Sequence, residues 1–213
     1  MMPGFETIIY EKDGEGVARL TLNRPGKLNA VNLQMRDELW QALLAFRDDP
    51  DARVLIVRGA GSAFCSGADL SEFGTAPTYV ESRRARQERD LWGLLLHLPK
   101  PVIAALHGYA LGAGLELALL CDLRLASEEA RLGVPEVGLG YIPSAGGTQT
   151  LPRAVPLGVA LRMILTGDPI DAREAYRLRL VQRLVPRGRL DAEAGAWARA
   201  LATRSPLALS CAK

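Results

Sequence analysis

The sequence predicts an α/β protein in which helices alternate with the strands of a largely parallel sheet. Three observations support this. The composition, 48% hydrophobic and 23% charged, is typical of a globular protein. Short β-branched runs alternate with segments of helical periodicity along the chain. No linker, low-complexity tract or strict repeat divides the 213 residues, which suit one large domain or two small ones.

The first elements are a hairpin and a helix. Residues 7–12 and 17–23 are strand-like, and the sequence DGEG between them predicts the turn. Residues 28–52 predict a helix with Asn32 as its N-cap. The expected apolar stripe of this helix consists of Leu33, Leu39, Leu43, Leu44 and Phe46.

The middle of the chain repeats the order of strand and helix. Residues 54–61, VLIVRGAG, predict a buried strand closed by glycines, and a loop follows over 62–74. A helix is expected over 79–99, then a strand over 101–110 and a second helix over 111–120. This alternation is the main reason for expecting parallel strands.

The remaining elements are shorter. Residues 122–135 predict a strand and a turn, and helices are expected over 156–165 and 171–180. A strand-like run follows at 180–186, and residues 191–205 predict a closing helix.

Several classes of protein are disfavoured. A formal net charge of +2 favours neither nucleic acid nor a membrane as a partner. Three widely spaced cysteines, Cys65, Cys121 and Cys211, argue against a disulfide framework or a zinc site. The N-terminus lacks a signal-peptide pattern and no apolar run is long enough to span a bilayer, so we expect a cytoplasmic protein.

Two loops of small residues could present backbone N–H groups to a ligand. In CSGADL, Gly67 and Ala68 precede a short helix, and in GYALGAGLE, Gly112 to Gly114 open another. Small residues allow a ligand to approach the backbone closely. Two N–H groups that converge on one oxygen form an oxyanion hole. The alternative is that both loops are simply tight turns before helices.

Two carboxylates have unusual settings. Glu116 lies among leucines and alanines, where an ionised carboxylate without a partner would be costly. Glu136 lies between Pro135 and a glycine-rich turn, twenty residues further on. Paired carboxylates can hold a water molecule and divide acid and base duties. Alternatively, Glu136 is a loop residue that caps nearby N–H groups.

Other candidates are weaker. His97 and His107 have no metal-ligand spacing around them, so we expect structural roles and no metal site. Ser66 lacks the setting of a hydrolytic nucleophile. A solvated helix face that could meet phosphate is expected for Arg83, Arg84, Arg86 and Arg89.

Three long motifs resemble the crotonase superfamily, and within it enoyl-CoA hydratase. They are AFCSGADL, HGYALGAGLELALLCDLRLA and LGVPEVGLGYIPSAGGTQTLPR, and the resemblance extends over residues 5–210. It implies a crotonase-like (ClpP/crotonase) spiral of β-β-α units over residues 1–190. Residues 191–213 would then begin a truncated C-terminal helical region that serves as lid and trimer contact.

The resemblance also implies an activity and its residues. The expected reaction is hydration of a 2-enoyl-CoA in fatty acid metabolism, without metal or redox cofactor. Ala68 and Ala113 would donate the oxyanion-hole N–H groups. Glu116 would activate water for attack at C3 and Glu136 would deliver a proton to C2, with the reverse assignment open. The residues expected to bind the CoA substrate are Lys27, Leu28, Ala30, Ala68, Asp69, Leu70, Ser71 and Gly112.

The expected partners are an acyl-CoA thioester and further copies of the chain, as a homotrimer or a dimer of trimers. Double-bond isomerisation is the nearest alternative reaction, and a non-catalytic acyl-CoA-binding protein is the alternative of another class. RNA binding has little support from the charge. The closing helix carries an apolar stripe for which later helices are the expected partner: Ala194, Trp197, Ala198 and Leu201.

Overall fold

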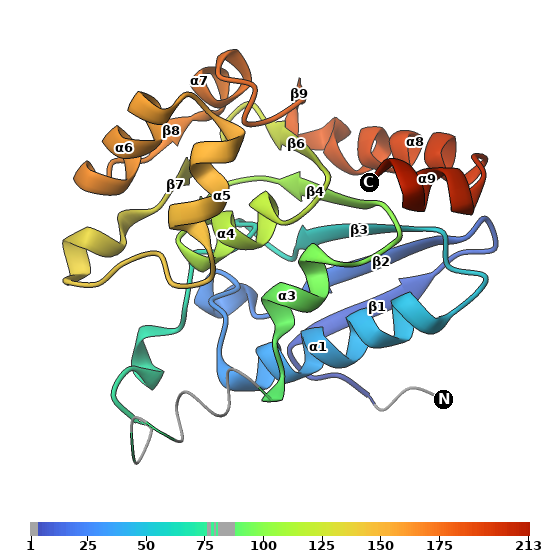
Figure 1. Cartoon of the computed structure of the whole chain (residues 1–213), viewed down its shortest axis with the longest axis horizontal. Helices are drawn as coiled ribbons and strands as arrows, with labels where there is room; N and C mark the ends of the chain where they lie inside the picture. Colours follow the sequence, from blue (N-terminus) through green and yellow to red (C-terminus); the bar gives the residue numbers. More distant parts are fainter. Residues whose placement is uncertain (1–3, 76–77, 79, 81–87) are drawn as a thin grey trace.

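The computed structural model describes residues 4–75, 78, 80 and 88–213, and it shows a layered α/β fold (Figure 1). The main sheet has six strands in the order β1-β2-β3-β4-β6-β9. Their bounds are Ile8–Lys12, Val17–Leu22, Val54–Gly59, Val102–Leu106, Leu123–Ser127 and Arg183–Val185. Strands β1 and β2 are antiparallel and every other neighbouring pair is parallel, which confirms the predicted hairpin and the predicted parallel pairing.

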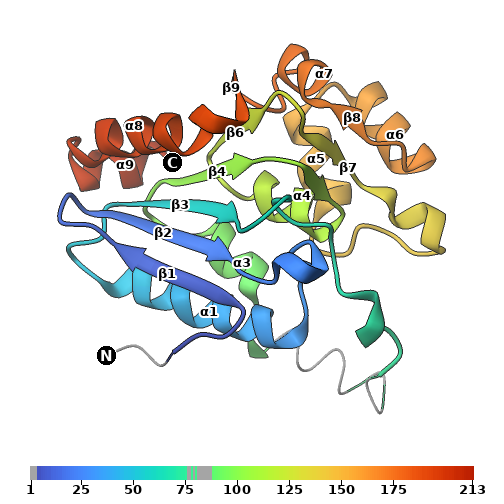
Figure 2. The same ribbon diagram turned by 180° about the vertical axis from the view of Figure 1, so that it is seen from behind.

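Helices cover both faces of this sheet. Helices α1 (Leu33–Asp48) and α3 (Leu91–Leu96) lie on one face, and α8 (Leu190–Ala202) lies on the other (Figure 2). Alternate residues of β3 therefore enter two separate cores. Leu55 and Val57 pack on the side of α1, whereas Val54 and Ile56 pack on the side of α8. A strand covered on both faces reads as a continuous apolar run, as the sequence VLIV does.

Helix α1 begins at the predicted N-cap, although the range of 28–52 expected for the helix was too long at both ends. The side chain of Asn32 accepts a hydrogen bond from the backbone N–H of Met35 at 2.9 Å, which confirms the N-cap. The buried stripe differs from the expected one, because Leu33 is exposed and Leu44 only half-buried. Its buried apolar members are Met35, Leu39, Ala42, Leu43 and Phe46.

The predicted strand over 101–110 is in fact two strands in two sheets. Strand β4 ends at Leu106, and β5 (Tyr109–Leu111) joins β7 (Arg131–Gly133) and β8 (Ile170–Asp171) in a second sheet. The bend falls at Gly108, whose φ of +54° suits glycine, and a Cβ there would collide with the backbone oxygen of Ser62.

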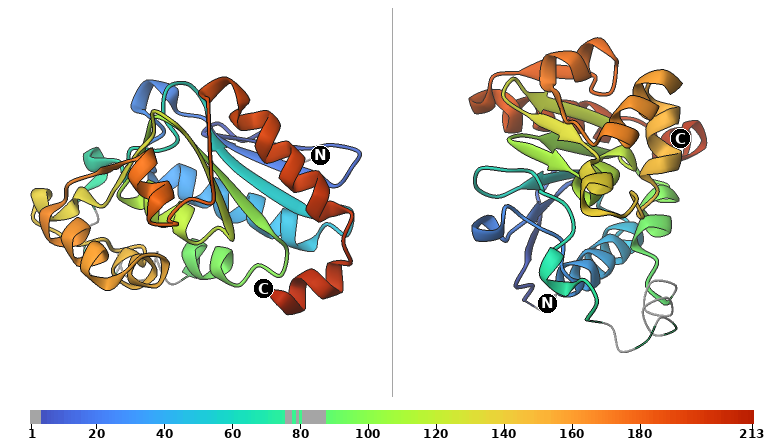
Figure 3. Two further views of the ribbon diagram at one scale, coloured as in Figure 1. Left: turned by 90° about the horizontal axis from the view of Figure 1, so that it is seen from above. Right: turned by 90° about the vertical axis from the view of Figure 1, so that its left-hand side faces the viewer.

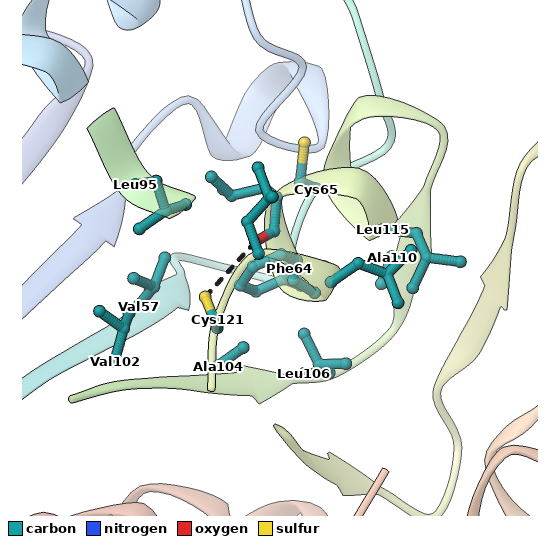
Figure 4. Close-up of a cluster of buried hydrophobic side chains, with 14 of the residues drawn as sticks. Val57, Phe64, Cys65, Leu95, Val102, Ala104, Leu106, Ala110, Leu115 and Cys121 are labelled. Carbon is teal, nitrogen blue, oxygen red and sulfur yellow. Dashed lines mark hydrogen bonds between the residues drawn. The ribbon is translucent and has the colours of Figure 1, made fainter. Parts of the chain in front are cut away.

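The second sheet lies beside a group of short helices. Helix α4 (Ala113–Leu119) is the helix predicted over 111–120, and α6 (Leu157–Thr166) and α7 (Ala172–Arg177) match predicted helices as well. Helix α5 (Gly147–Ala154) was missed, because its first turn has the sequence of a glycine-rich loop. Figure 4 shows the core beneath α4, where Phe64, Leu115 and Cys121 are buried together.

Helix α8 finds its partner surface in the main sheet, so the expectation that later helices provide it was wrong. Leu190, Ala194 and Ala198 are spaced by four residues and pack on the strands. Figure 3 shows α8 lying along the sheet, with α9 (Pro206–Ala212) beyond it. No residue of α9 is buried. The division of the chain at residue 190 stays a prediction.

Part of the helix predicted over 79–99 falls outside the described residues, as do Arg83, Arg84 and Arg86. Arg89 forms an ion pair of 2.6 Å with Asp37 and lies over the ring of Trp40. In the described part of the chain, every helix is too short or too polar to cross a lipid bilayer.

Candidate active site

A short pairing brings the two small-residue loops side by side. The backbone N–H of Cys65 donates to Tyr109 O at 2.9 Å, and the N–H of Leu111 donates to Cys65 O at 3.0 Å. Beyond this pairing, a Cβ built on Gly67 would lie 3.3 Å from Leu111 O and 3.9 Å from the backbone nitrogen of Ala113. The loop that holds Ala68 therefore lies against the beginning of α4.

The backbone N–H groups of Ala68 and Ala113 are uncommitted. Gly67 O accepts from the N–H of Val31 at 2.8 Å, and the N–H of Asp69 donates to Val31 O at 2.9 Å. The N–H of Ala68, which lies between these two bonds, points to the opposite side of this extended segment. Ala113 is the first residue of α4, so its N–H has no partner within the helix. Within the described residues, neither N–H donates to a protein acceptor.

Glu116 is buried on α4 and its carboxylate has two backbone donors. Its side chain is 2% exposed. Oε1 accepts from the N–H of Ala145 at 2.8 Å and from the N–H of Gly147 at 2.7 Å. A Cβ on Gly147 would lie 2.9 Å from this oxygen, so the glycine allows the close approach. Burial, with a smaller contribution from the charge of Glu136, raises the pKa of Glu116 to about 7 despite both donors.

Glu136 is equally buried, on the 3-10 turn Pro135–Leu139, with 2% of its surface exposed. Oε2 lacks a hydrogen-bond partner among the described residues, and a Cβ on Gly112 would lie 2.8 Å from Oε1. Burial raises the pKa of this carboxyl also. No hydrogen bond in the described chain joins its side chain to the backbone of another residue, which speaks against the capping role considered from the sequence.

The two acids thus lie close to each other and to the two loops. Glu116 lies three residues after Ala113 on α4. The side chain of Glu136 lies against Gly112, the residue that precedes this helix. The charge of each carboxylate also raises the pKa of Tyr141, after the larger effect of burial. Tyr141 was missed from the sequence; its ring meets Phe73 edge-on at 5.1 Å, which joins the turn after Glu136 to the turn after Ala68.

The residues expected to bind CoA form one continuous region. Lys27 ends a 3-10 turn, and Leu28 follows with a φ of +48°. Leu28 O accepts from the N–H of Ser66 at 3.0 Å, which places residues 27–30 against the loop of Ala68. In that loop, the Asp69 carboxylate accepts hydrogen bonds from the N–H and the hydroxyl of Ser71. Leu70 is exposed, and Ala30 is half-buried.

The remaining sequence candidates have structural contacts. The Nδ1 of His97 lies 2.8 Å from Gly93 O, and the Nε2 of His107 lies 3.1 Å from Gly61 O. Burial raises the pKa of Cys65 and of Cys121 to about 12, so neither thiol is a nucleophile at neutral pH. Among the residues that the structure describes, no group of three His, Cys, Asp or Glu could hold a metal ion.

Glu116→Gln should change how stability depends on pH. With a pKa of about 7, Glu116 keeps its proton in the native state up to about that pH, whereas an unperturbed glutamate has a pKa of 4.5. Between these values the native state binds more protons, so the free energy of unfolding of the wild type falls as pH rises through this window. Glutamine does not titrate and can still accept both backbone N–H groups. Urea unfolding should show that the stability of the variant, relative to that of the wild type, is greater at pH 8 than at pH 5. The same stability difference at both pH values would contradict the raised pKa.

Comparisons with known proteins agree with this arrangement. Residues 12–213 match the family model described as enoyl-CoA hydratase/isomerase. A probable enoyl-CoA hydratase of Mycobacterium tuberculosis is 42% identical over 98% of this chain and 80% of that protein. A crotonyl-CoA hydratase of Syntrophomonas wolfei is 39% identical over 98% of this chain and 80% of its own length. The crystal structure of an enoyl-CoA hydratase from Bacillus anthracis superimposes with a TM-score of 0.90 at 39% identity, over 97% of this chain and 81% of that one.

The structural similarity and the family match show that the protein has the crotonase-like fold. This confirms the fold class expected from the sequence. The chain belongs to the enoyl-CoA hydratase/isomerase family.

Proposed function

We propose that the protein is an enoyl-CoA hydratase, which adds water across the 2,3 double bond of a 2-enoyl-CoA to give a 3-hydroxyacyl-CoA. The observation that carries the proposal is the pair of buried glutamates, from separate elements, beside two uncommitted backbone N–H groups. Hydratase names among the relatives, including a crotonyl-CoA hydratase, support the same reaction.

The thioester carbonyl oxygen binds between the N–H groups of Ala68 and Ala113. Attack at C3 moves the electrons of the double bond toward this oxygen and creates an enolate. Donors that are already in place stabilise that charge as it develops, without reorganisation. The CoA portion follows residues 27–30, the loop from Ala68 to Ser71, and Gly112.

The glutamates move the protons. Glu116 accepts a proton from the water as its oxygen bonds to C3, and Glu136 delivers a proton to C2. The two carboxyls have raised pKa values, so the pair can hold one proton near neutral pH. The two N–H donors to Glu116 Oε1 favour its ionised form, but burial outweighs them and raises the pKa to about 7, so the reverse assignment of acid and base is the alternative. Proton exchange with solvent restores both groups. Because the elements of water add across the double bond without net oxidation or reduction, the step requires no redox cofactor, and the proposal assigns no role to a metal.

The test is to incubate the purified protein with crotonyl-CoA and follow the loss of absorbance of the conjugated thioester, with the product identified by mass. Hydration supports the proposal. Binding of acyl-CoA without turnover would instead indicate an acyl-CoA-binding protein. Conversion of a 3-enoyl-CoA to the 2-enoyl isomer without hydration would indicate an isomerase.

Gly112→Ala should lower the hydration rate by about ten- to a hundredfold, the scale expected for a misplaced catalytic group. The new Cβ would lie 2.8 Å from Glu136 Oε1 and so displace the carboxylate, and the φ of +49° disfavours alanine. Gly138→Ala is the matched control, because a Cβ at Gly138 meets nothing within 4 Å. Steady-state kinetics of both variants test this; equal rates would show that Gly112 does not position Glu136.

We further propose that the protein is a homotrimer or a dimer of trimers, with residues 191–213 beginning the trimer-forming region. Helix α6 supports association, since Leu157, Leu161 and Leu165 form an exposed stripe along one face. A cytoplasmic location is proposed as well, in line with the free thiols of all three cysteines. Light scattering in solution measures the number of subunits.

A further inference from the structure

An ion pair lies directly behind the loop that carries Ala68. Arg24 Nη1 donates to Asp69 Oδ2 at 2.9 Å and to Ala30 O at 2.5 Å. The side chains of Arg24 and Asp69 are 19% and 12% exposed, so solvent screens this pair less than an open surface pair. One guanidinium nitrogen thus joins the segment 27–30 to the residue that follows Ala68.

The segment that holds Arg24, residues 24–31, has a conformation fixed by its own contacts. The fully buried Asn29 side chain accepts from the N–H of Arg24 at 2.9 Å and donates to Ala60 O and Ala63 O at 2.9 and 2.8 Å. Leu28 and Asn29 both have positive φ, at 48° and 56°. Such conformations cost energy in residues other than glycine, and persist only where the surroundings determine them. The segment therefore provides a fixed base for Arg24.

The same segment pairs with the loop of Ala68 through its backbone. Its backbone makes three hydrogen bonds to that loop, through Leu28 O to Ser66 and through the N–H and oxygen of Val31 to Gly67 and Asp69. The Ala68 N–H shares one planar peptide unit with Gly67 O, so the bond from the Val31 N–H to Gly67 O sets the direction in which the Ala68 N–H points. Arg24 holds the two segments in this register, because it joins Ala30 O to the Asp69 carboxylate on the other side of Ala68.

We propose that Arg24 is a positioning residue, which keeps the Ala68 N–H aimed at the thioester oxygen by clamping Asp69 to the segment that pairs with the loop of Ala68. The proposal rests on the proposed hydratase function. Oxyanion donors must lie about 2.7–3.1 Å from the developing charge. A misplacement of about 1 Å can cost about a hundredfold in rate. Hydrogen bonds from Ser71 and Arg24 hold the pKa of Asp69 below its usual value, so the ion pair is charged at neutral pH.

The experiment compares Arg24→Met on two substrates, crotonyl-CoA and the N-acetylcysteamine thioester of crotonic acid, which lacks the nucleotide. We expect kcat to fall by at least about tenfold, and by a similar factor for both, because the oxyanion is common to the two substrates. Arg19→Met is the matched control. It breaks an ion pair with Asp13 of 3.0 Å in the β1–β2 hairpin, with side chains 27% and 28% exposed, and should leave kcat unchanged.

Asp69→Asn provides a second measurement that does not depend on the folding of Arg24→Met. Asparagine keeps the shape of the side chain but removes its charge, so it should also lower kcat on both thioesters. In a double-mutant cycle, Arg24→Met should add little to Asp69→Asn, because both act through one contact.

Three outcomes would overturn the proposal. A loss confined to the CoA substrate would mean that Arg24 binds the nucleotide. A kcat equal to that of Arg19→Met would reduce Arg24 to a structural role. If the wild type hydrates neither thioester, the hydratase function itself fails, and the positioning role with it.

Discussion

Glu116→Gln and Glu136→Gln should each lower the rate of crotonyl-CoA hydration by about two or more orders of magnitude, the scale of a positioned acid or base. Glutamine can neither accept the proton of the attacking water nor donate one to C2. Both side chains are almost fully buried, so bulk water has little access to replace them. Stopped-flow or steady-state absorbance measurements give the rates.

Two controls separate a chemical effect from a structural one. Acyl-CoA binding, measured by calorimetry, should largely persist, because neither glutamate is among the residues proposed to bind CoA. Glu38→Gln removes another buried glutamate, which accepts hydrogen bonds from the N–H and hydroxyl of Thr7 at the N-terminal strand. It should lower stability while the folded protein keeps its rate. Near wild-type turnover in either site variant would refute the two-acid mechanism.

Ala113→Pro should lower kcat by about 10²–10³, the usual effect of losing one oxyanion donor. Proline has no N–H, and the first position of a helix tolerates proline, since the N–H there has no partner in the helix. Ala113→Gly keeps the N–H and should be far milder, with a helix-propensity cost of at most about 1 kcal/mol. The two variants thus differ chiefly in the N–H group itself.

Ala68→Pro tests the other donor in the same way. It should also lower kcat by about 10²–10³. Circular dichroism and thermal melts establish whether each variant is folded before its kinetics are compared. If the glycine variant were as damaged as a correctly folded proline variant, backbone donation at Ala113 would be excluded.

The sequence was sufficient wherever the determining interactions are local. Asn32 caps α1 through the N–H of Met35, three residues away, and the turn between β1 and β2 closes over residues 13–16. The continuous apolar run of β3 requires cover on both faces, which only a sheet between two helical layers provides. Glu116 was conspicuous for a similar reason, because a carboxylate among leucines needs either a partner or a function.

The three long motifs predicted something that these local rules could not, because they indicated the family before any tertiary contact was known. They did not indicate which residues hold the site together. Arg24 meets Asp69 across 45 positions of the chain, and Tyr141 meets Phe73 across 68. No periodicity or spacing encodes such contacts, because they form only when separate elements pack.

What the sequence by itself determined is the alternation of strands and helices, the family, and the candidate acids and N–H donors. Only the tertiary structure decided that Glu136 rests against Gly112, that Gly108 divides one apolar run between two sheets, and that α8 packs on the sheet. The physical reason is range. Capping, turns and periodicity depend on residues a few positions apart, whereas the pKa of a buried acid and the partner of a helix depend on atoms that folding brings from elsewhere in the chain.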